Sequence, residues 1–500
     1  MAESGGAVAN KWYSRVSHAI SSVASKITKP DNAVFPDHIC DGKYAHDMPK
    51  IPVAPLGCNL WSASTGPNAG MCQLDPLLDT FPDDGQPIAG IVNWRNGKQF
   101  ADGASASLYD KIPGKNKHSG DPIADVFAVV VHDNSSILAI ADGVNWGHKP
   151  RLAARCAIHG ALSHIINKFF SSKSDGPRTT HDIFHTLLRS FQFAQESILK
   201  HEGTTTTLCI AIVCELMPPK GPTRWGCCLV SVGDSLAYVY RRRLNVVEEL
   251  TSVIHVGSER DMRDCGGCLG PHIGTEPDLE NLFLIFAPVE ESDIIFLTTD
   301  GVSDNFDPVV RKEAQSMKSM HQVPYDSDPD TPTDNATPYS LGKDHVEPLP
   351  FLTPSERHAH SLKHMTNVIH TYSHNDISLI TAANVAVDLI TSCVTATDQQ
   401  RLYLEENVLS DDCTPEERRQ NYRQVKKALK NLPGKLDHAT AVAYEVCHRG
   451  NGISAIQWQS RKQTFTKAYS ADQSFQRLPP YDDEEWTELE KLRSSTAESI

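Results

Sequence analysis

Two apolar runs that each end on an aspartate and a glycine constrain this chain most. Residues Ile137–Gly147 read ILAIADGVNWG, so the apolar run stops at Asp142 and turns at Gly143. Residues Ile294–Gly301 read IIFLTTDG and repeat the pattern much later in the chain. Runs of this length and composition predict buried strands. We therefore expect two strands that each deliver a carboxylate to a sheet edge.

Two further acids stand at predicted strand edges. Asp110 follows the run SASLY, and Asp437 directly precedes the last predicted strand. A single aspartate at such a place usually only caps a turn. Together with Asp142 and Asp300, however, the acids would repel one another strongly unless cations lay among them, and magnesium and manganese prefer carboxylate oxygens. The joint pattern favours a two-metal site, in which the ions hold an activated water against a phosphoryl group.

Charge and cysteine usage narrow the classes of partner and compartment. The formal net charge is −15, so the chain has no overall positive field to attract nucleic acid or an anionic membrane. The 13 cysteines are odd in number and several lie inside apolar strands, which favours reduced thiols and a cytoplasmic or nuclear location. We find no apolar stretch of about 18 residues and expect no transmembrane segment.

The first 90 residues are predicted to form an N-terminal arm. An apolar stripe at helical spacing (Trp12, Val16, Ile20, Val23, Ile27) predicts one amphipathic helix, and frequent proline and glycine then disfavour regular elements up to about Gly90. The helix either docks on a partner or a membrane surface, or belongs to a transit peptide, or lies on the protein's own core. The last alternative is the commonest for amphipathic helices.

The segments 91–306 and 359–448 are predicted to form one α+β domain. Strand patterns alternate with helical ones and are joined by hairpin turns, which favours antiparallel sheets flanked by helices over a doubly wound parallel sheet. The predicted strands are Phe127–Val131, Ile137–Ala141, Thr204–Glu215, Gly226–Val232, Ala237–Arg241, Asn281–Phe286, Ile294–Thr298 and Ala439–Val446. The predicted helices are Arg151–Phe170, Asp182–Leu199, most of Ser361–Val408, and one that begins at the capping box Thr414–Glu417.

Two polar segments lie outside this pattern. Residues 307–358 are rich in acids and proline and are predicted to be a flexible insertion, and residues 449–500 form a polar, acidic C-terminal tail. The insertion comes after Asp304 and leaves the predicted catalytic edge of the sandwich. We therefore hypothesise that it shields or regulates the mouth of the acidic site, because its acids would compete with an anionic substrate.

Five short motifs in order resemble those of the metal-dependent protein phosphatases (PPM, type 2C). They are similar to the family's DGxGG, GTT, GDSRxY, SDGLWD and DNxT motifs. The matching runs are Asp142–Gly147 (DGVNWG), Glu202–Thr205 (EGTT), Val232–Tyr238 (VGDSLAY), Thr299–Asp304 (TDGVSD) and Leu436–Thr440 (LDHAT).

The resemblance implies a fold and an activity. The fold would be a four-layer α/β/β/α sandwich of two antiparallel sheets flanked by helices. The activity would be hydrolysis of phosphoserine and phosphothreonine in a phosphoprotein substrate, with two manganese or magnesium ions. By matching position, Asp142 would bridge both ions and the Gly143 carbonyl would bind one. Asp300 and Asp437 would hold the other ion, and Asp110 would orient a metal-bound water.

The chain also departs from the family pattern. The family places an arginine five residues before the aspartate matched by Asp110 and a glutamate just before it, but here these residues are Ser105 and Tyr109. The histidine that follows DG in many members is Val144, and the asparagine of DNxT is His438. One metal ligand and the phosphate-binding guanidinium are thus missing.

Two hypotheses follow from this mixture. The chain is an active serine/threonine phosphatase whose phosphate is bound by another cation, with Lys111, His148, Lys149 and Arg151 the nearest in sequence. Alternatively, it is a pseudophosphatase that keeps the fold and acts as a binding or scaffolding protein. Retention of the aspartates favours activity, because an acidic cluster is costly to keep near a core. Loss of the arginine and glutamate favours the alternative.

Overall fold

The computed structural model describes residues 35–82, 85–171, 174–252, 265–317, 349–373, 379–408 and 413–449. These residues lie in the first of two compact units, Met1–Arg449, and the second unit is Gly450–Ile500. The predicted N-terminal helix, the centre of the insertion and the acidic tail fall outside the described residues. None of the described helices is both long and apolar enough to cross a membrane.

The larger sheet has eight strands, all in antiparallel pairs. Every residue of the central strands β5 and β6 is buried. Both faces of these strands are therefore covered, which explains their continuous apolar runs. In spatial order the strands are β1 (Cys40–Gly42), β13 (Phe283–Val289), β8 (Arg224–Val232), β7 (Leu208–Leu216), β6 (Ser135–Ala141), β5 (Val126–His132), β2 (Leu60–Gly66) and β3 (Arg95–Asn96).

The smaller sheet has five strands, also antiparallel. Their order is β10 (Val246–Glu249), β9 (Leu236–Arg241), β14 (Ile294–Thr298), β17 (His438–Glu445) and β4 (Ala101–Ser107). Two further pairs lie apart, the antiparallel β11 (Cys268–Ile273) with β12 (Glu276–Asp278) and the parallel β15 (Gln315–Ser316) with β16 (Phe351–Leu352).

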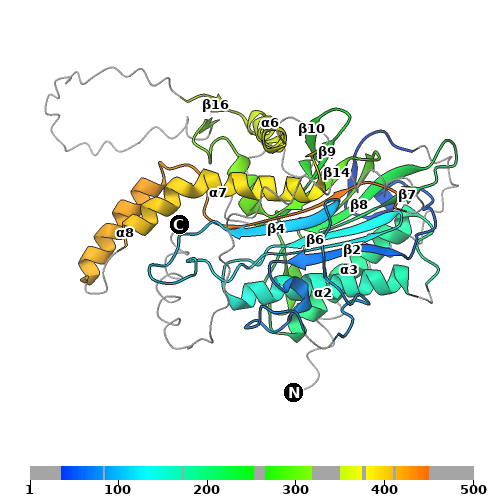
Figure 1. The fold of residues 1–500 in the computed structure, drawn as a ribbon, viewed down its shortest axis with the longest axis horizontal. Helices are drawn as coiled ribbons and strands as arrows, with labels where there is room; N and C mark the ends of the chain where they lie inside the picture. Colours follow the sequence, from blue (N-terminus) through cyan, green and yellow to red (C-terminus); the bar gives the residue numbers. More distant parts are fainter. Residues whose placement is uncertain are drawn as a thin grey trace. The chain divides into compact units, whose positions relative to one another are not determined.

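Helices cover the outer face of each sheet (Figure 1). Helices α2 (His148–Phe170) and α3 (Thr180–Lys200) pack on the larger sheet, and α6 (Pro354–Tyr372) and α7 (Ala382–Glu406) pack on the smaller one. The described residues also form helix α8 (Pro415–Leu429). Short helical turns are η2 (Ala45–Asp47), η3 (Gly70–Cys72), α4 (Asp300–Ser303) and η5 (Asp304–Phe306). The predicted four-layer sandwich of antiparallel sheets is confirmed.

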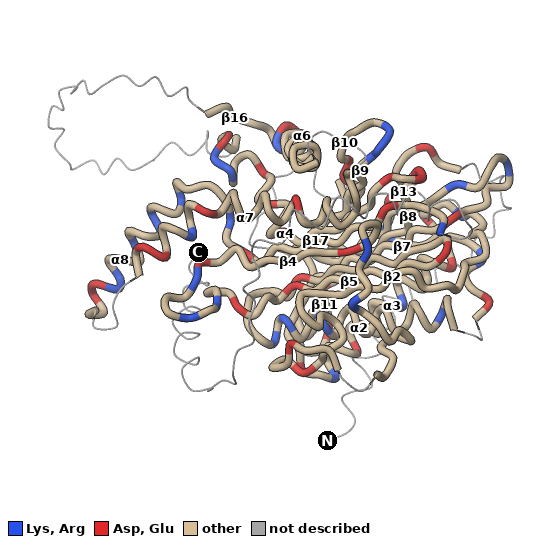
Figure 2. The backbone as a smooth tube through the Cα atoms, viewed as in Figure 1, with Lys and Arg blue, Asp and Glu red and all other residues tan. Residues whose placement is uncertain are grey.

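Helix α8 follows the predicted capping box. The Thr414 hydroxyl accepts a hydrogen bond from the Glu417 main chain, and Pro415 occupies the first turn. None of its residues is buried, and its acidic side chains lie in the first turn with basic ones after them (Figure 2). Local sequence signals rather than core packing therefore define this helix.

Part of the expected N-terminal arm belongs to the larger sheet. Strand β2 pairs along its length with β5, with Ala63 opposite Val130, and Ala63 is fully buried. Ile51 and Met71 are buried in the same core. The prolines and glycines of residues 35–90 thus lie in short connections between segments that pack on the core. This differs from the irregular arm that we expected.

The insertion also differs from expectation at its C-terminal end. Helix α6 begins at Pro354, inside the segment 307–358, and Thr353 caps it by accepting a hydrogen bond from the Glu356 main chain at 3.3 Å. Arg357 in the first turns of this helix pairs with Asp307 at 2.7 Å. The two ends of the insertion are therefore tied to each other.

Candidate functional site

Antiparallel pairing places acids from distant parts of the chain at one end of the sandwich. Val126 pairs with Ala141, so Asp125 before β5 and Asp142 after β6 are neighbours. Thr298 pairs with Ala441, so the end of β14 and the start of β17 also meet, and these ends carry Asp300 and Asp437. The structure therefore brings together three of the four predicted acids and adds Asp125.

The main chain of Asp142 is held by two threonines that begin β7. The Asp142 amide donates to the Thr207 hydroxyl at 3.0 Å. The Asp142 carbonyl accepts from the Thr206 hydroxyl at 2.8 Å and from the Thr207 amide at 2.8 Å. Thr207 in turn bonds the hydroxyl of Ser235 at 3.0 Å. The two threonines that follow the EGTT run, together with Ser235 of the GDS motif, thus position the first acid.

Two motif glycines are required by close approaches of the backbone. A Cβ at Gly301 would lie 1.9 Å from the carbonyl oxygen of His438, and a Cβ at Gly143 would lie 2.5 Å from the carbonyl oxygen of Pro150. Only glycine fits either place without movement of the main chain. The DG pairs therefore serve packing at the site as well as its chemistry.

Asp125 is a site residue that sequence reasoning missed. It is fully buried, and one oxygen accepts a hydrogen bond from the Thr299 hydroxyl at 2.9 Å. Its other oxygen has no hydrogen-bond partner among the described residues. Burial, together with the charges of Asp437 and Asp300, raises the pKa of Asp125 to about 8 despite the threonine hydroxyls.

Asp142 lies among the same acids. Burial raises its pKa well above the usual value, and the carboxylates of Asp125, Asp300 and Asp437 raise it further. Asp234, from the GDS motif, adds a smaller effect of the same sign. We call Asp125, Asp142, Asp300, Asp304 and Asp437 the acidic cluster.

A lysine lies inside the acidic cluster. The Lys435 ammonium is 2.6 Å from Asp300, 2.8 Å from Asp304 and 3.0 Å from Asp437. Burial alone would lower the pKa of Lys435, but the charges of Asp304, Asp300 and Asp437 outweigh it and raise that pKa well above its usual value. The side chain is therefore a fixed positive charge at this end of the cluster.

Asp110 lies in a different environment from the one we predicted. Its carboxylate accepts a hydrogen bond from the Ser119 hydroxyl at 2.6 Å, and its carbonyl accepts from the Ser119 amide at 2.8 Å. It is not among the groups that shift the pKa of Asp142. Its neighbour Tyr109 instead reaches the cluster, with its hydroxyl 3.5 Å from Asp437. Asp110 thus closes a loop, whereas Asp125 lies beside Asp142.

His438 fastens the segment that leads to Asp125. Its Nε2 donates to the Gly120 carbonyl at 2.9 Å, and its Nδ1 accepts from the Ala124 amide at 3.2 Å. Burial lowers the pKa of His438 to about 4, so the ring is neutral at pH 7. The histidine that replaces the family asparagine therefore has a structural role.

The four basic residues expected near the phosphate have other contacts or are exposed. Arg151 pairs with Asp79 and donates to the Leu78 carbonyl at 3.1 Å. His148 contacts the Pro76 carbonyl at 3.0 Å, and Lys111 and Lys149 are exposed. Among the residues that the structure describes, Lys435, two residues before a predicted acid, pairs with acids of the cluster.

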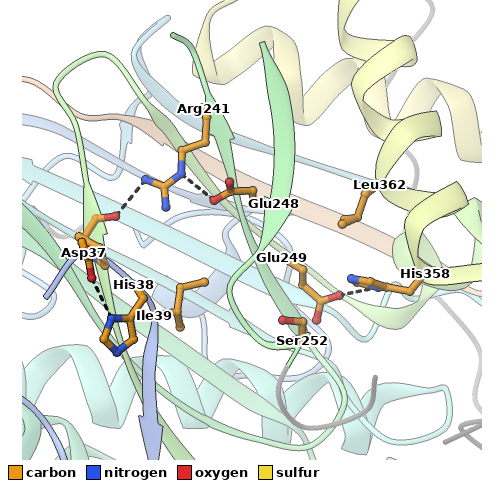
Figure 3. A pocket seen from close by; sticks show the side chains of 10 residues that line it. Asp37, His38, Ile39, Arg241, Glu248, Glu249, Ser252, His358 and Leu362 are labelled. Atoms are coloured by element: carbon orange, nitrogen blue, oxygen red, sulfur yellow. Dashed lines mark hydrogen bonds and ion pairs between the residues drawn. The ribbon is translucent and has the colours of Figure 1, made fainter. Parts of the chain in front are cut away.

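A polar cavity away from the acidic cluster contains acids that are each paired with a basic side chain. A cavity of about 430 Å³ is lined by residues of β9, β10, α6 and the segment before β1 (Figure 3). In it Glu248 pairs with Arg241 at 2.8 Å, and Glu249 lies 3.4 Å from His358. Each of these acids has its own basic neighbour, whereas three acids of the cluster share Lys435.

The acidic cluster as arranged does not fit two divalent ions. Among the residues that the structure describes, no group of three or more His, Cys, Asp or Glu side chains is placed to hold a metal. The reason is visible at Asp300, Asp304 and Asp437, whose oxygens surround the Lys435 ammonium. A divalent ion at that place would have to displace a positive charge.

The antiparallel sandwich and its edge of aspartates define a PP2C-like domain. A fruit fly protein, the PP2C-like domain-containing protein CG9801 of Drosophila melanogaster, is 34% identical over 441 residues, which cover 72% of this chain. No protein-family model matches. The chain belongs to the PP2C-like family as a divergent member. It spans 62% of the fly protein's length.

Solved structures give a weaker likeness. The S. agalactiae serine/threonine phosphatase is 13% identical, the match covers 69% of this chain and 99% of that chain, and the TM-score is 0.31. The photosystem II phosphatase PBCP is 15% identical, with 70% and 99% covered and a TM-score of 0.31. Scores this low carry no argument, so the assignment rests on the motifs, the topology and the fly relative.

Proposed function

We propose that this chain is a pseudophosphatase, a binding or scaffolding protein on the PP2C-like fold. The observation that carries the proposal is the place of Asp125. When the family pattern is counted back from Asp125 instead of Asp110, the glutamate position is Ala124 and the arginine position is Gly120. Neither residue has a side chain that could bind a metal or a phosphate, and both are fastened by His438.

The partner of such a protein would be a phosphoprotein, or a protein that acts in the same signalling pathway as that phosphoprotein. PP2C-like proteins act on phosphorylated proteins, and a domain that lost turnover would keep the surfaces that recognise them. All 13 cysteines are unpaired thiols, which supports the proposed cytoplasmic or nuclear location. A docking role for the N-terminal amphipathic helix remains a proposal on residues outside those described.

A second candidate function is a metal-dependent serine/threonine phosphatase. The retained acids favour it, because Asp142, Asp300 and Asp437 lie together at one end of the sandwich. Manganese or magnesium would then neutralise a transferring phosphoryl group. The presence of Lys435 among these acids makes this the weaker of the two candidates.

A hydrolysis assay separates the two candidates. The full chain is incubated with manganese or magnesium and either an aryl phosphate or a phosphothreonine peptide, beside Asp142→Asn and Asp300→Asn. The matched control is Asp110→Asn, because Asp110 bonds Ser119 rather than the cluster. A pseudophosphatase gives the same background rate in all four proteins. Metal-dependent turnover that Asp142→Asn and Asp300→Asn abolish and Asp110→Asn keeps would overturn the proposal.

A further inference from the structure

We infer that Lys435 is a built-in cation, which occupies the place of a divalent ion between Asp300, Asp304 and Asp437 and keeps metal out of that half of the cluster. Removal of its charge would then open a site for manganese or magnesium. The inference rests on the proposed function, since it gives the physical reason why a PP2C-like domain has no catalytic metal at these acids.

The geometry of the ammonium supports the inference. A lysine ammonium has three protons to donate and no acceptor. Here three carboxylate oxygens from three different aspartates lie at 2.6, 2.8 and 3.0 Å from Nζ. Every proton thus has a charged acceptor, and the Lys435 side chain is 23% exposed. The group is coordinated as a cation would be, rather than placed at the rim of the site.

The main chain around Lys435 fixes the side chain in this place. The Lys435 amide donates to the Asn305 side chain at 2.9 Å, and the Lys435 carbonyl accepts from the same side chain at 2.9 Å. Gly434, just before it, has φ of +94° and donates to the Val310 carbonyl at 3.0 Å. A residue with a side chain is strained in that conformation. Hydrogen bonds therefore hold the main chain of Lys435 in place next to the acids.

Charge balance explains why a metal and the lysine exclude each other. The three carboxylates carry a formal charge of −3, and Lys435 reduces this to −2. A divalent ion that used the same oxygens would lie within a few ångströms of the ammonium, and like charges at such a distance repel strongly in a partly buried site. One occupant must leave, and only the metal can diffuse away.

The test measures metal binding rather than hydrolysis. Lys435→Met keeps most of the length of the side chain and removes its charge, Lys435→Arg keeps the charge, and Lys111→Met is the matched control at an exposed lysine. Each full-length protein is stripped with EDTA and titrated with manganese by calorimetry, and its melting temperature is followed with added metal. We expect Lys435→Met to bind manganese at least about tenfold more tightly than the other proteins and to melt later with metal.

Removal of the lysine alone could unfold the protein, because three carboxylates would then face one another. The double variant Lys435→Met with Asp304→Asn relieves part of that repulsion and should show the same gain in manganese binding relative to Asp304→Asn alone. Equal manganese affinity in the wild type, Lys435→Arg and Lys435→Met would overturn the inference, as would a double variant without any gain.

Failure of this inference is distinct from failure of the proposed function. Turnover by the wild type would contradict the pseudophosphatase proposal whatever the titrations show. Lys435→Met that binds metal but remains inactive supports both, because Gly120 and Ala124 still offer no side chain to the phosphate or the metal. Absence of metal binding by an inactive Lys435→Met would contradict the inference alone.

Discussion

The two halves of the acidic cluster solve the same electrostatic problem differently. Asp300, Asp304 and Asp437 surround the Lys435 ammonium, so their charge is balanced by a side chain. Asp125 and Asp142 have no basic partner among the groups that shift their pKa values, and burial and neighbouring carboxylates raise both pKa values. A counter-charge partly compensates the first half, and protonation lowers the charge of the second.

This difference shows where the chain depends on a single residue. Loss of a buried counter-charge leaves its partners uncompensated, whereas a protonated carboxyl behaves as a neutral polar group. Substitutions that remove a charge should therefore destabilise the protein in the half with Lys435, whereas the half with Asp125 should tolerate them. The predictions below test that contrast, beginning with the largest effect.

Lys435→Met should destabilise the metal-free protein by about 3–5 kcal/mol, because it leaves the three carboxylates that share Lys435 without their cation. Denaturant unfolding in EDTA measures the change. The control Lys111→Met should stay within about 0.5 kcal/mol of the wild type. Equal stability of both variants would show that Lys435 does not balance the acids.

The second prediction concerns His132, a base outside the acidic cluster that burial keeps in its neutral form. His132 is 4% exposed and stacks on Phe170 at 3.8 Å, and burial lowers its pKa to about 4 despite the charge of Asp133. A base with a lowered pKa contributes stability above its unfolded pKa of about 6.5 and loses it as the pH falls towards 4. The loss should reach about 3 kcal/mol at most.

His132→Phe isolates that contribution, because phenylalanine keeps the stacking and cannot be protonated. Unfolding free energies of the wild type and the variant are compared at several pH values from 7 down to 4. We expect the difference between them to grow in favour of the variant as the pH falls. A difference that stays constant over this range would show that His132 is protonated equally in both states.

The third prediction compares two isosteric changes within the cluster. Asp304→Asn removes one of the three charged acceptors of Lys435 and should cost about 1–3 kcal/mol. Asp125→Asn replaces a buried carboxyl whose second oxygen has no hydrogen-bond partner among the described residues, and should be neutral or stabilising by about 1 kcal/mol at pH 7. Denaturant midpoints give both values, and equal losses would remove the contrast between the halves.

Local patterns predicted the acids that follow or precede an apolar strand. The sequence predicted Asp142, Asp300 and Asp437 because each lies next to an apolar run, and these runs form strands that are buried on both faces. Asp125 stands just before the run that forms β5 and had the same kind of signal. It was missed because we matched the aspartate of the family's first motif to Asp110, which follows a less apolar run.

Long-range contacts set the limit of what the sequence could predict. Lys435 meets Asp300 across a gap of 135 positions, and no periodicity marks such a contact. Strand β2 pairs with β5 although prolines and glycines surround it, because its partner strand supplies the hydrogen bonds. The helix capping of α8, in contrast, depends on neighbours in sequence and was predicted correctly.

A crystal of the full chain soaked in manganese tests the central claim most directly, since anomalous scattering locates the metal. We expect the Lys435 ammonium to remain within hydrogen-bonding distance of Asp300, Asp304 and Asp437, with no manganese peak among those three carboxylates. A manganese ion bound there, with Lys435 turned away, would contradict the account of Lys435 as the resident cation of this site.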